Sequence, residues 1–74
     1  MRELTPRVVI DPKVRFGKPV IKGTRVPVDL LIGKIAGGMT IEEVAKEYDL
    51  TRTDIFAALK YAAKALQRET LMYV

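Results

Sequence analysis

The sequence predicts a mainly α fold, a three-helix bundle of the helix-turn-helix type, homeodomain-like or winged-helix-like, with a short extended or β-ribbon arm at its N-terminus. Two observations predict it. From Pro27 onward the apolar residues recur at helical spacing, and helix-capping sequences divide them into three runs. Before Pro27, short β-branched runs alternate with Pro and Gly, which is typical of short strands and turns. We therefore divide the chain into a basic arm (residues 1–26), a helix-turn-helix domain (27–67) and an apolar C-terminal tail (68–74).

The arm contains two apolar runs that we expect to be extended. Arg7–Ile10 is rich in β-branched residues and ends at the turn sequence Asp11-Pro12, and Val20-Ile21 is the second run. Because Pro cannot donate a backbone hydrogen bond to a sheet, the Pro residues at 12, 19 and 27 limit any strands here to short, edge-like ones.

Capping signals set the expected helix boundaries. The first helix begins near Pro27 and ends at Gly37-Gly38. The second begins with a capping box formed by Thr40 and Glu43, and the third follows the turn Asp49-Leu50 and a further cap in residues 51–54. The apolar faces are Val28, Leu31, Ile32 and Ile35 in the first helix, Ile41, Val44, Ala45 and Tyr48 in the second, and Ile55, Ala58, Leu59, Ala62 and Leu66 in the third.

Size and hydrophobicity together predict a partner chain. A chain of 74 residues forms one domain, and a domain this small removes only about 60% of its unfolded surface from water. Yet 49% of the residues are hydrophobic, which is more than so small a core hides comfortably. We therefore expect another chain to cover part of the apolar surface, in a homodimer or in a complex with a second protein.

The composition excludes several classes of site. The chain has no Cys for a disulfide or a thiolate metal site, and no His, the commonest metal ligand and general base. The only close acid pair, Glu42-Glu43, lies in a capping turn, where acids favour the helix dipole. We expect no enzymatic activity, no metal and no cofactor.

The composition also predicts where the protein works. The first residues carry charge and Pro where a signal peptide needs an apolar core, and no segment approaches membrane-spanning length, so we expect a soluble cytoplasmic protein. The absence of Ser and Asn, with Gln67 as the single Gln and many charges, is a composition seen in proteins from hot environments.

Positive charge is concentrated in the N-terminal half. The formal net charge is +4 and the sequence pI is about 9.6, which suits a nucleic-acid partner. Residues 1–34 hold eight Lys and Arg against three Asp and Glu, a net charge of +5, whereas residues 35–74 hold five against six, a net charge of −1.

Residues Ile41 to Lys60 resemble the helix-turn-helix pattern of DNA-binding proteins. Small Ala45 allows close approach of the two helices, and Leu50 fills the turn. Asp49 replaces the usual turn Gly and is able to adopt the left-handed conformation at some cost.

The third helix would place several side chains in a major groove. The positions near its start that lie off the core face are Thr51, Arg52, Thr53, Phe56, Ala57 and Lys60. Arg52 is suited to a bidentate pair with guanine, Thr51 and Thr53 to phosphate or a thymine methyl, and Lys60 to the DNA backbone. Phe56 suits a protein contact at least as well as a base contact. The alternative is that these residues form a solvated face of a three-helix scaffold.

Residues 17–28 form a distinctive stretch, Gly17-Lys18-Pro19-Val20-Ile21-Lys22-Gly23-Thr24-Arg25-Val26-Pro27-Val28. Together with Gly38-Met39-Thr40 and Tyr48, this stretch resembles a prokaryotic family catalogued as a domain of unknown function. The family is often found beside toxin genes and is antitoxin-like, of the VapB type. The resemblance covers about residues 10–63. It implies a small protein that neutralises a PIN-like ribonuclease toxin encoded nearby and represses its own operon.

Two interpretations of the Gly-Thr-Arg-Val-Pro core remain open. Gly23 and Thr24 are typical of a tight turn that presents Arg25. In one interpretation Lys22 and Arg25, with Arg15 and Lys18, grip DNA phosphates. In the other the motif docks the arm on the helices, with Arg25 bonded to a carbonyl or an acid, since apolar Val20, Ile21 and Val26 must be buried somewhere.

The C-terminal tail is a second candidate surface. Leu71, Met72 and Tyr73 continue apolar after the helix-turn-helix is complete, and they would either fold back on the core or, with Phe56, bind a partner. The sequence thus predicts an antitoxin-like, dimeric DNA-binding regulator. The alternative is a protein-interaction adaptor whose helix-turn-helix scaffold does not bind DNA.

Overall fold

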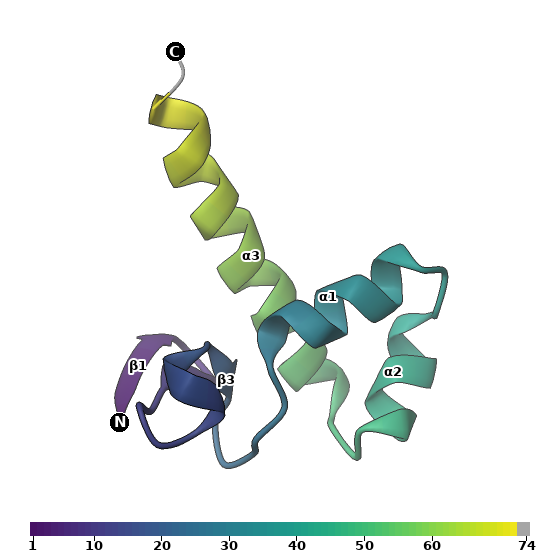
Figure 1. Ribbon diagram of the computed structural model, residues 1–74. Helices are drawn as coiled ribbons and strands as arrows, with labels where there is room; N and C mark the ends of the chain where they lie inside the picture. Colours follow the sequence, from purple (N-terminus) through teal and green to yellow (C-terminus); the bar gives the residue numbers. More distant parts are fainter. Residues whose placement is uncertain (73–74) are drawn as a thin grey trace.

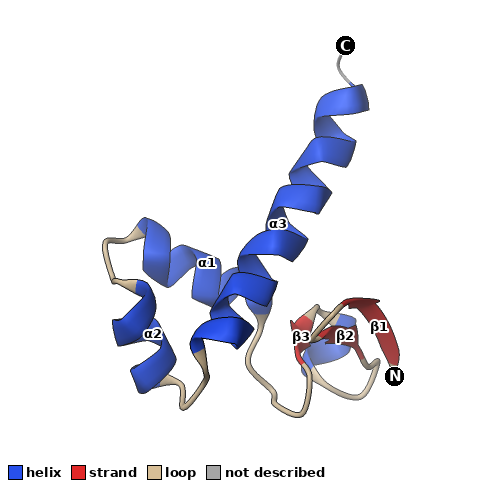
Figure 2. Cartoon of the chain, turned by 180° about the vertical axis from the view of Figure 1, so that it is seen from behind, coloured by secondary structure: helices blue, strands red, loops and turns tan. Residues whose placement is uncertain are grey.

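The computed structural model describes the backbone of residues 1–72 and the side chains of residues 1–68, and it contains three helices and a three-stranded antiparallel sheet (Figures 1 and 2). In chain order the elements are β1 (Arg2–Thr5), β2 (Val8–Ile10), the short turn η1 (Arg15–Gly17), β3 (Val20–Ile21), α1 (Val28–Ala36), α2 (Ile41–Glu47) and α3 (Arg52–Met72). The predicted helices and the two predicted extended runs are present. The strand β1 was not predicted, because Arg2 and Glu3 give residues 2–5 little β-propensity.

The sheet is a hairpin extended by one more short strand. β1 pairs with β2 across the two-residue turn Pro6-Arg7, and Arg7 takes a left-handed φ of 72° there. β2 then pairs with β3, joining Val8 to Ile21. Both of these side chains are fully buried in the main core. The N-terminal segment is therefore a packed layer of the same core as the helices.

The Gly-Thr-Arg-Val-Pro core forms a tight turn, as predicted. The Thr24 amide donates to the Ile21 carbonyl at 3.0 Å, and Gly23 has a φ of 79°, the left-handed value that a type II turn requires at its third residue. The Thr24 hydroxyl donates to the same carbonyl at 2.8 Å and accepts the Val26 amide at 3.1 Å. The turn thus returns the chain antiparallel to β3 and delivers Pro27 to the start of α1.

The first two helices end in the same motif. At the end of α1 the Met39 amide donates to the Lys34 carbonyl, and Gly38 is left-handed with a φ of 109°. At the end of α2 the Leu50 amide donates to the Ala45 carbonyl, and Asp49 takes the left-handed φ of 55° predicted for the position of the usual Gly. These are Schellman motifs, which turn the chain sharply into the next element. The capping box of Thr40 and Glu43 is also present at the start of α2.

The core lies where α3 meets the other elements. The fully buried side chains of Leu31 from α1, Val44 from α2 and Ile55 from α3 meet Val8 and Ile21 from the sheet. The sheet lies beside the first half of α3, and α1 and α2 lie on its other side (Figures 1 and 2). Ala57 faces the core and is 8% exposed, so its predicted place on the outer face of the helix is wrong.

The second half of α3 projects from the body of the molecule (Figure 1). Side chains 63–68 are all exposed, and Leu66, expected on the core face, is 61% exposed. The helical spacing of Leu66 is correct, because it lines a groove with Val28 and Ile32 of α1, but that groove leaves it largely exposed. One continuous helix therefore replaces the predicted boundary between the bundle and a separate tail. Leu71 and Met72 lie in its last turn, with side chains outside the described part, and Tyr73 lies outside the described residues.

Candidate nucleic-acid interface

The first turn of α3 is fixed by a reciprocal cap. The Thr51 hydroxyl accepts the Asp54 amide at 3.1 Å, and the Asp54 carboxylate accepts the Thr51 amide at 3.2 Å. The predicted cap is confirmed. As a result the Thr51 hydroxyl, expected to reach phosphate or a thymine methyl, is engaged in holding the start of the helix.

An ion pair joins the β-hairpin to this cap. The Arg7 guanidinium lies 2.7 Å from the Asp54 carboxylate through Nη2 and 2.9 Å through Nε, and Asp54 is 4% exposed. Burial raises the pKa of Asp54, but the hydrogen bond from the Thr51 amide and the contact with the Arg7 guanidinium outweigh it and hold the pKa below its ordinary value. The carboxylate is therefore ionised at neutral pH and holds Arg7 against α3.

A basic groove runs between the β-hairpin and α3. We call it the hairpin groove and define it by its lining residues, which are Thr5, Pro6, Arg7, Thr53, Phe56, Ala57, Lys60, Ala63, Lys64 and Gln67. Lys60 and Lys64 lie one turn apart on the same face of the helix, and Arg7 lines the groove from the hairpin. Of the predicted DNA-binding residues, Thr53 and Lys60 line this groove.

Arg52 lies at the start of α3 next to the groove. Its guanidinium forms an ion pair with Glu42 of α2 and lies over the ring of Phe56, 5.5 Å from the ring centroid. Phe56 is 40% exposed, so part of its ring stays accessible beside the Arg52 guanidinium. Arg52 is exposed, and an ion pair on an exposed surface contributes little stability. The guanidinium is thus able to exchange Glu42 for a phosphate or a base edge at low cost.

The two predicted arm residues are not in the hairpin groove. Lys22 lies 3.7 Å from the Glu3 carboxylate of β1, so its charge is partly neutralised. Arg25 is exposed on the tight turn, and its side chain makes no hydrogen bond or ion pair with a described residue. Its carbonyl accepts a hydrogen bond from Arg15 at 3.2 Å. The turn itself buries Val20 and Ile21, as the docking interpretation requires.

The two basic groove residues Arg7 and Lys64 were not found from the sequence. Lys64 follows Lys60 by four residues, and that spacing alone was enough to place both on one face. Arg7 gave no such signal, because its partner Asp54 is 47 residues away and the contact exists only in the folded chain.

Comparison with known proteins places the chain in a family. The family model described as "Protein of unknown function (DUF433)" matches residues 8–62. The chain belongs to this family. The match begins at β2 and ends within α3, so it contains β2, β3, α1, α2 and the first half of α3, and it leaves out β1 and the projecting half of α3.

Three relatives are similar to this DUF433 member. An uncharacterized protein of Archaeoglobus fulgidus is 74% identical over 23 residues, which are 31% of this chain and 64% of that protein. The crystal structure of a DUF433 member from Anabaena variabilis is 30% identical with a TM-score of 0.77, over 88% of this chain and 65% of that one. The crystal structure of Rv2018 from Mycobacterium tuberculosis is 36% identical with a TM-score of 0.65, over 70% of this chain and 24% of that one. The chain thus spans less than two thirds of each relative.

The described residues contain neither a metal-binding cluster nor a membrane-spanning helix. No group of three or more Asp or Glu side chains there is arranged to hold a metal ion. None of the helices in that part of the chain is long and apolar enough to cross a membrane.

Proposed function

We propose that this DUF433 member is a DNA-binding transcriptional regulator of the antitoxin type, in which α2, the Asp49 turn and α3 act as a helix-turn-helix. The observation that carries the proposal is the hairpin groove, in which Lys60 and Lys64 line the α3 side and Arg7, already paired with Asp54, lines the hairpin side. Phosphate contacts supply most of the affinity of DNA-binding proteins and fix their register on the duplex.

The packing of α2 against α3 supports the helix-turn-helix assignment. Ala45 is buried between the two helices, and the Schellman motif at Asp49 turns the chain into the Thr51 cap without a long loop. This leaves Arg52, Thr53 and Lys60 exposed on the first turns of α3, the part of a recognition helix that contacts base edges. In this arrangement Arg52 reads a base or grips a phosphate, and Thr53 and Lys60 contact the backbone.

The family resemblance and the shape of α3 support the rest of the proposal. The resemblance implies a PIN-like ribonuclease toxin as protein partner and an operon repressed by its own antitoxin. The projecting half of α3 offers exposed helix surface, including Leu66, for a second copy or for the toxin. We propose that the chain acts as a homodimer and binds the toxin without being an enzyme itself.

Fluorescence anisotropy with the DNA upstream of its own gene tests the proposal. Arg52→Ala is expected to weaken specific binding by about 1–3 kcal/mol and to relax the sequence preference. Lys60→Ala and Lys64→Ala are expected to weaken binding to all sequences and to reduce the salt dependence of the affinity, with a slope smaller by about 1 for each phosphate that is no longer neutralised. Paired Lys22→Ala and Arg25→Ala changes test the arm in the same way.

The matched control is Lys13→Ala, which removes one positive charge from an exposed side chain outside the groove. Its affinity and salt slope are expected to equal those of the wild type. Absence of any binding at low salt would rule out the DNA-binding function.

The second candidate function is a protein-interaction adaptor. It is favoured by Phe56, which is 40% exposed, lines the same groove and suits a protein anchor. Phe56→Ala separates the two: it should abolish capture of the purified neighbouring gene product if the groove binds protein, and leave capture intact if the groove binds DNA.

A further inference from the structure

A second surface of the molecule carries an aromatic side chain that is fully outside the fold. Phe16 is 102% exposed, and it occupies the loop that joins β2 to β3. Exposed single apolar residues are common, but a fully exposed Phe loses the benefit of burial. No motif in the sequence predicted a role for this residue.

The backbone holds Phe16 in this position. Arg15 and Phe16 have left-handed φ angles of 52° and 56°, and Gly17 follows at 81°. Left-handed backbone is costly for residues other than Gly, and most of all for bulky ones. The loop is nevertheless well bonded, because the Val14 amide donates to Asp11, Gly17 to Val14 and Lys18 to Arg15, all within 3.1 Å. Phe16 is thus presented by an ordered, strained turn.

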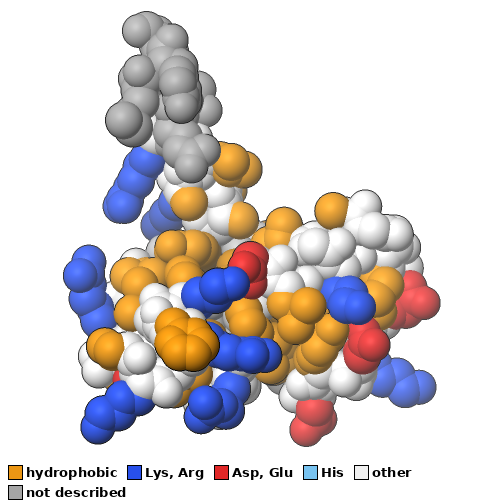
Figure 3. Space-filling view, in the orientation of Figure 1, with side chains coloured by type: hydrophobic (Ala, Val, Ile, Leu, Met, Phe, Trp, Pro, Cys, Tyr) orange, Lys and Arg blue, Asp and Glu red, His pale blue; other side chains and the backbone are white. Residues whose placement is uncertain are grey.

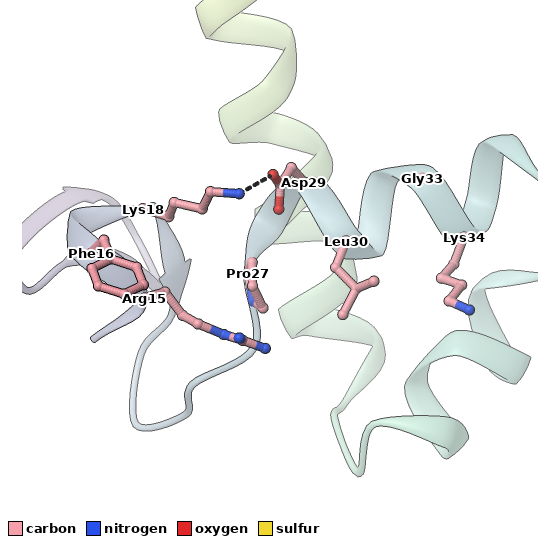
Figure 4. Close-up of a pocket in the computed structure, with 8 residues that line it drawn as sticks. All are labelled: Arg15, Phe16, Lys18, Pro27, Asp29, Leu30, Gly33 and Lys34. Atoms are coloured by element: carbon pink, nitrogen blue, oxygen red, sulfur yellow. Dashed lines mark hydrogen bonds and ion pairs between the residues drawn. The ribbon is translucent and has the colours of Figure 1, made fainter.

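Phe16 forms one wall of a groove that the outer face of α1 completes (Figure 4). Pro27 and Leu30 supply apolar surface on the α1 side, and Arg15 extends from the loop towards α1 beside Pro27. This loop–α1 groove shares no lining residue with the hairpin groove among the residues described. The two surfaces are therefore able to be occupied at the same time.

The charge around the loop–α1 groove is positive. Arg15, Lys18 and Lys34 line it, and Asp29 is its only acidic lining residue in the described chain. Asp29 is neutralised by Lys18, whose Nζ lies 3.2 Å from its carboxylate (Figure 4). Figure 3 shows hydrophobic side chains among Lys and Arg on this side of the molecule, with acidic side chains gathered over α2. The groove therefore offers an apolar centre between uncompensated cations.

We propose that the loop–α1 groove binds an acidic segment of a different protein, anchored by an apolar side chain against Phe16 and Leu30. The apolar floor favours a protein segment over a nucleic acid strand, because strand-binding grooves use successive aromatic platforms and this one has a single ring. A second copy of the chain is disfavoured as well. In a two-fold symmetric contact, Arg15 and Lys34 of one copy would face the same cations of the other copy. An unsymmetrical contact between this groove and the acidic α2 of another copy would build open chains of molecules.

Selection from a random displayed peptide library on the folded protein tests this proposal. The enriched peptides are expected to be acidic with one or two large apolar residues. In titrations with isotope-labelled protein they should shift the amide resonances of residues 15–18 and 28–34 and leave those of Lys60 and Lys64 in place.

Two variants and one control localise the binding. Phe16→Ser and Lys34→Glu are each expected to weaken the selected peptide by about tenfold or more, as loss of an anchor does, whereas Lys60→Glu should not change its affinity. Circular dichroism should show that both variants remain folded, because Phe16 is fully exposed and neither Phe16 nor Lys34 belongs to the core cluster.

Three results would overturn the proposal. The first is enrichment on the Phe16→Ser protein equal to that on the wild type. The second is selection of neutral or basic peptides. The third is a short oligothymidylate that shifts the same amides when the acidic peptides do not. The amide shifts of the wild-type protein locate the peptide even if a variant unfolds. None of these outcomes depends on whether the hairpin groove binds DNA.

Discussion

At the scale of single residues, an ion pair between Arg7 and Asp54 connects the β-hairpin to α3, the helix proposed to read DNA. Arg7 is strained, with a φ of 72°, and Asp54 is a buried charge. A buried carboxylate is tolerated only when its hydrogen bonds are made, and here the Thr51 amide and the Arg7 guanidinium make them. This ion pair fixes the hairpin groove as well as the helix start.

Removal of Arg7 should therefore lower stability. Arg7→Ala leaves the Asp54 carboxylate with the Thr51 amide, and we expect a loss of about 1–2 kcal/mol, since the half-exposed guanidinium is partly screened. Thermal unfolding followed by circular dichroism should show a melting temperature lower by about 4–8 °C per kcal/mol. Lys13→Ala should leave it unchanged, and an equal loss in both variants would mean that the ion pair does not stabilise the fold.

The same pair predicts a pH dependence. Because the pKa of Asp54 is lowered on folding, its ionised form stabilises the folded state above the ordinary pKa of an Asp, and that stabilisation is lost as the pH falls through this value towards the folded pKa. The free energy of unfolding of the wild type should thus fall more steeply below about pH 5 than that of Asp54→Asn. Parallel curves from denaturant titrations would contradict the assignment.

At the scale of elements, capping and turn chemistry could be predicted from the sequence because they depend on neighbouring residues. Thr40 with Glu43, Gly38, and Asp49 in the left-handed conformation are all where local rules place them. Ala57 and Leu66 were assigned to the wrong environment, because helical periodicity gives a face but not the element that covers it. The sheet buries the first, and the end of the bundle exposes the second.

The candidate site was predictable only in part for the same reason. Thr53 and Lys60 are near each other along one helix, and the structure brings them together. Other features depend on how separate elements pack. They are the ion pair of Arg7 with Asp54, the pairing of Arg52 with Glu42 and, at the second groove, the exposure of Phe16. No spacing rule within the sequence reports that packing.

The projecting half of α3 leads to a prediction about truncation. Side chains 63–67 are exposed, so α3 has already left the bundle before the truncation point, and a chain that ends at Gln67 should keep nearly all of its thermal stability and its circular dichroism per residue. Loss of co-purification with the neighbouring gene product would then assign the missing turns to partner binding. A melting temperature several degrees lower would instead show that the tail packs on the core.

At the scale of the whole molecule, the chain extends 38 × 30 × 19 Å along its principal axes, and its longest helix projects beyond the core. Exposed apolar surface on that helix, together with 49% hydrophobic residues, predicts self-association. Sedimentation at micromolar concentration should give twice the monomer mass of 8.3 kDa. A single species at the monomer mass would contradict the homodimer and leave the projecting helix for another partner.

The proposed DNA-binding surface is tested most directly by a titration of isotope-labelled protein with the duplex upstream of its gene, followed by nuclear magnetic resonance. We predict that the amide resonances of Arg52, Thr53, Lys60 and Lys64 shift together with that of Arg7, and that the shifts weaken as salt is added. A duplex of unrelated sequence should shift the groove residues but not Arg52. Shifts confined to residues outside the hairpin groove, or none at low salt, would contradict the account.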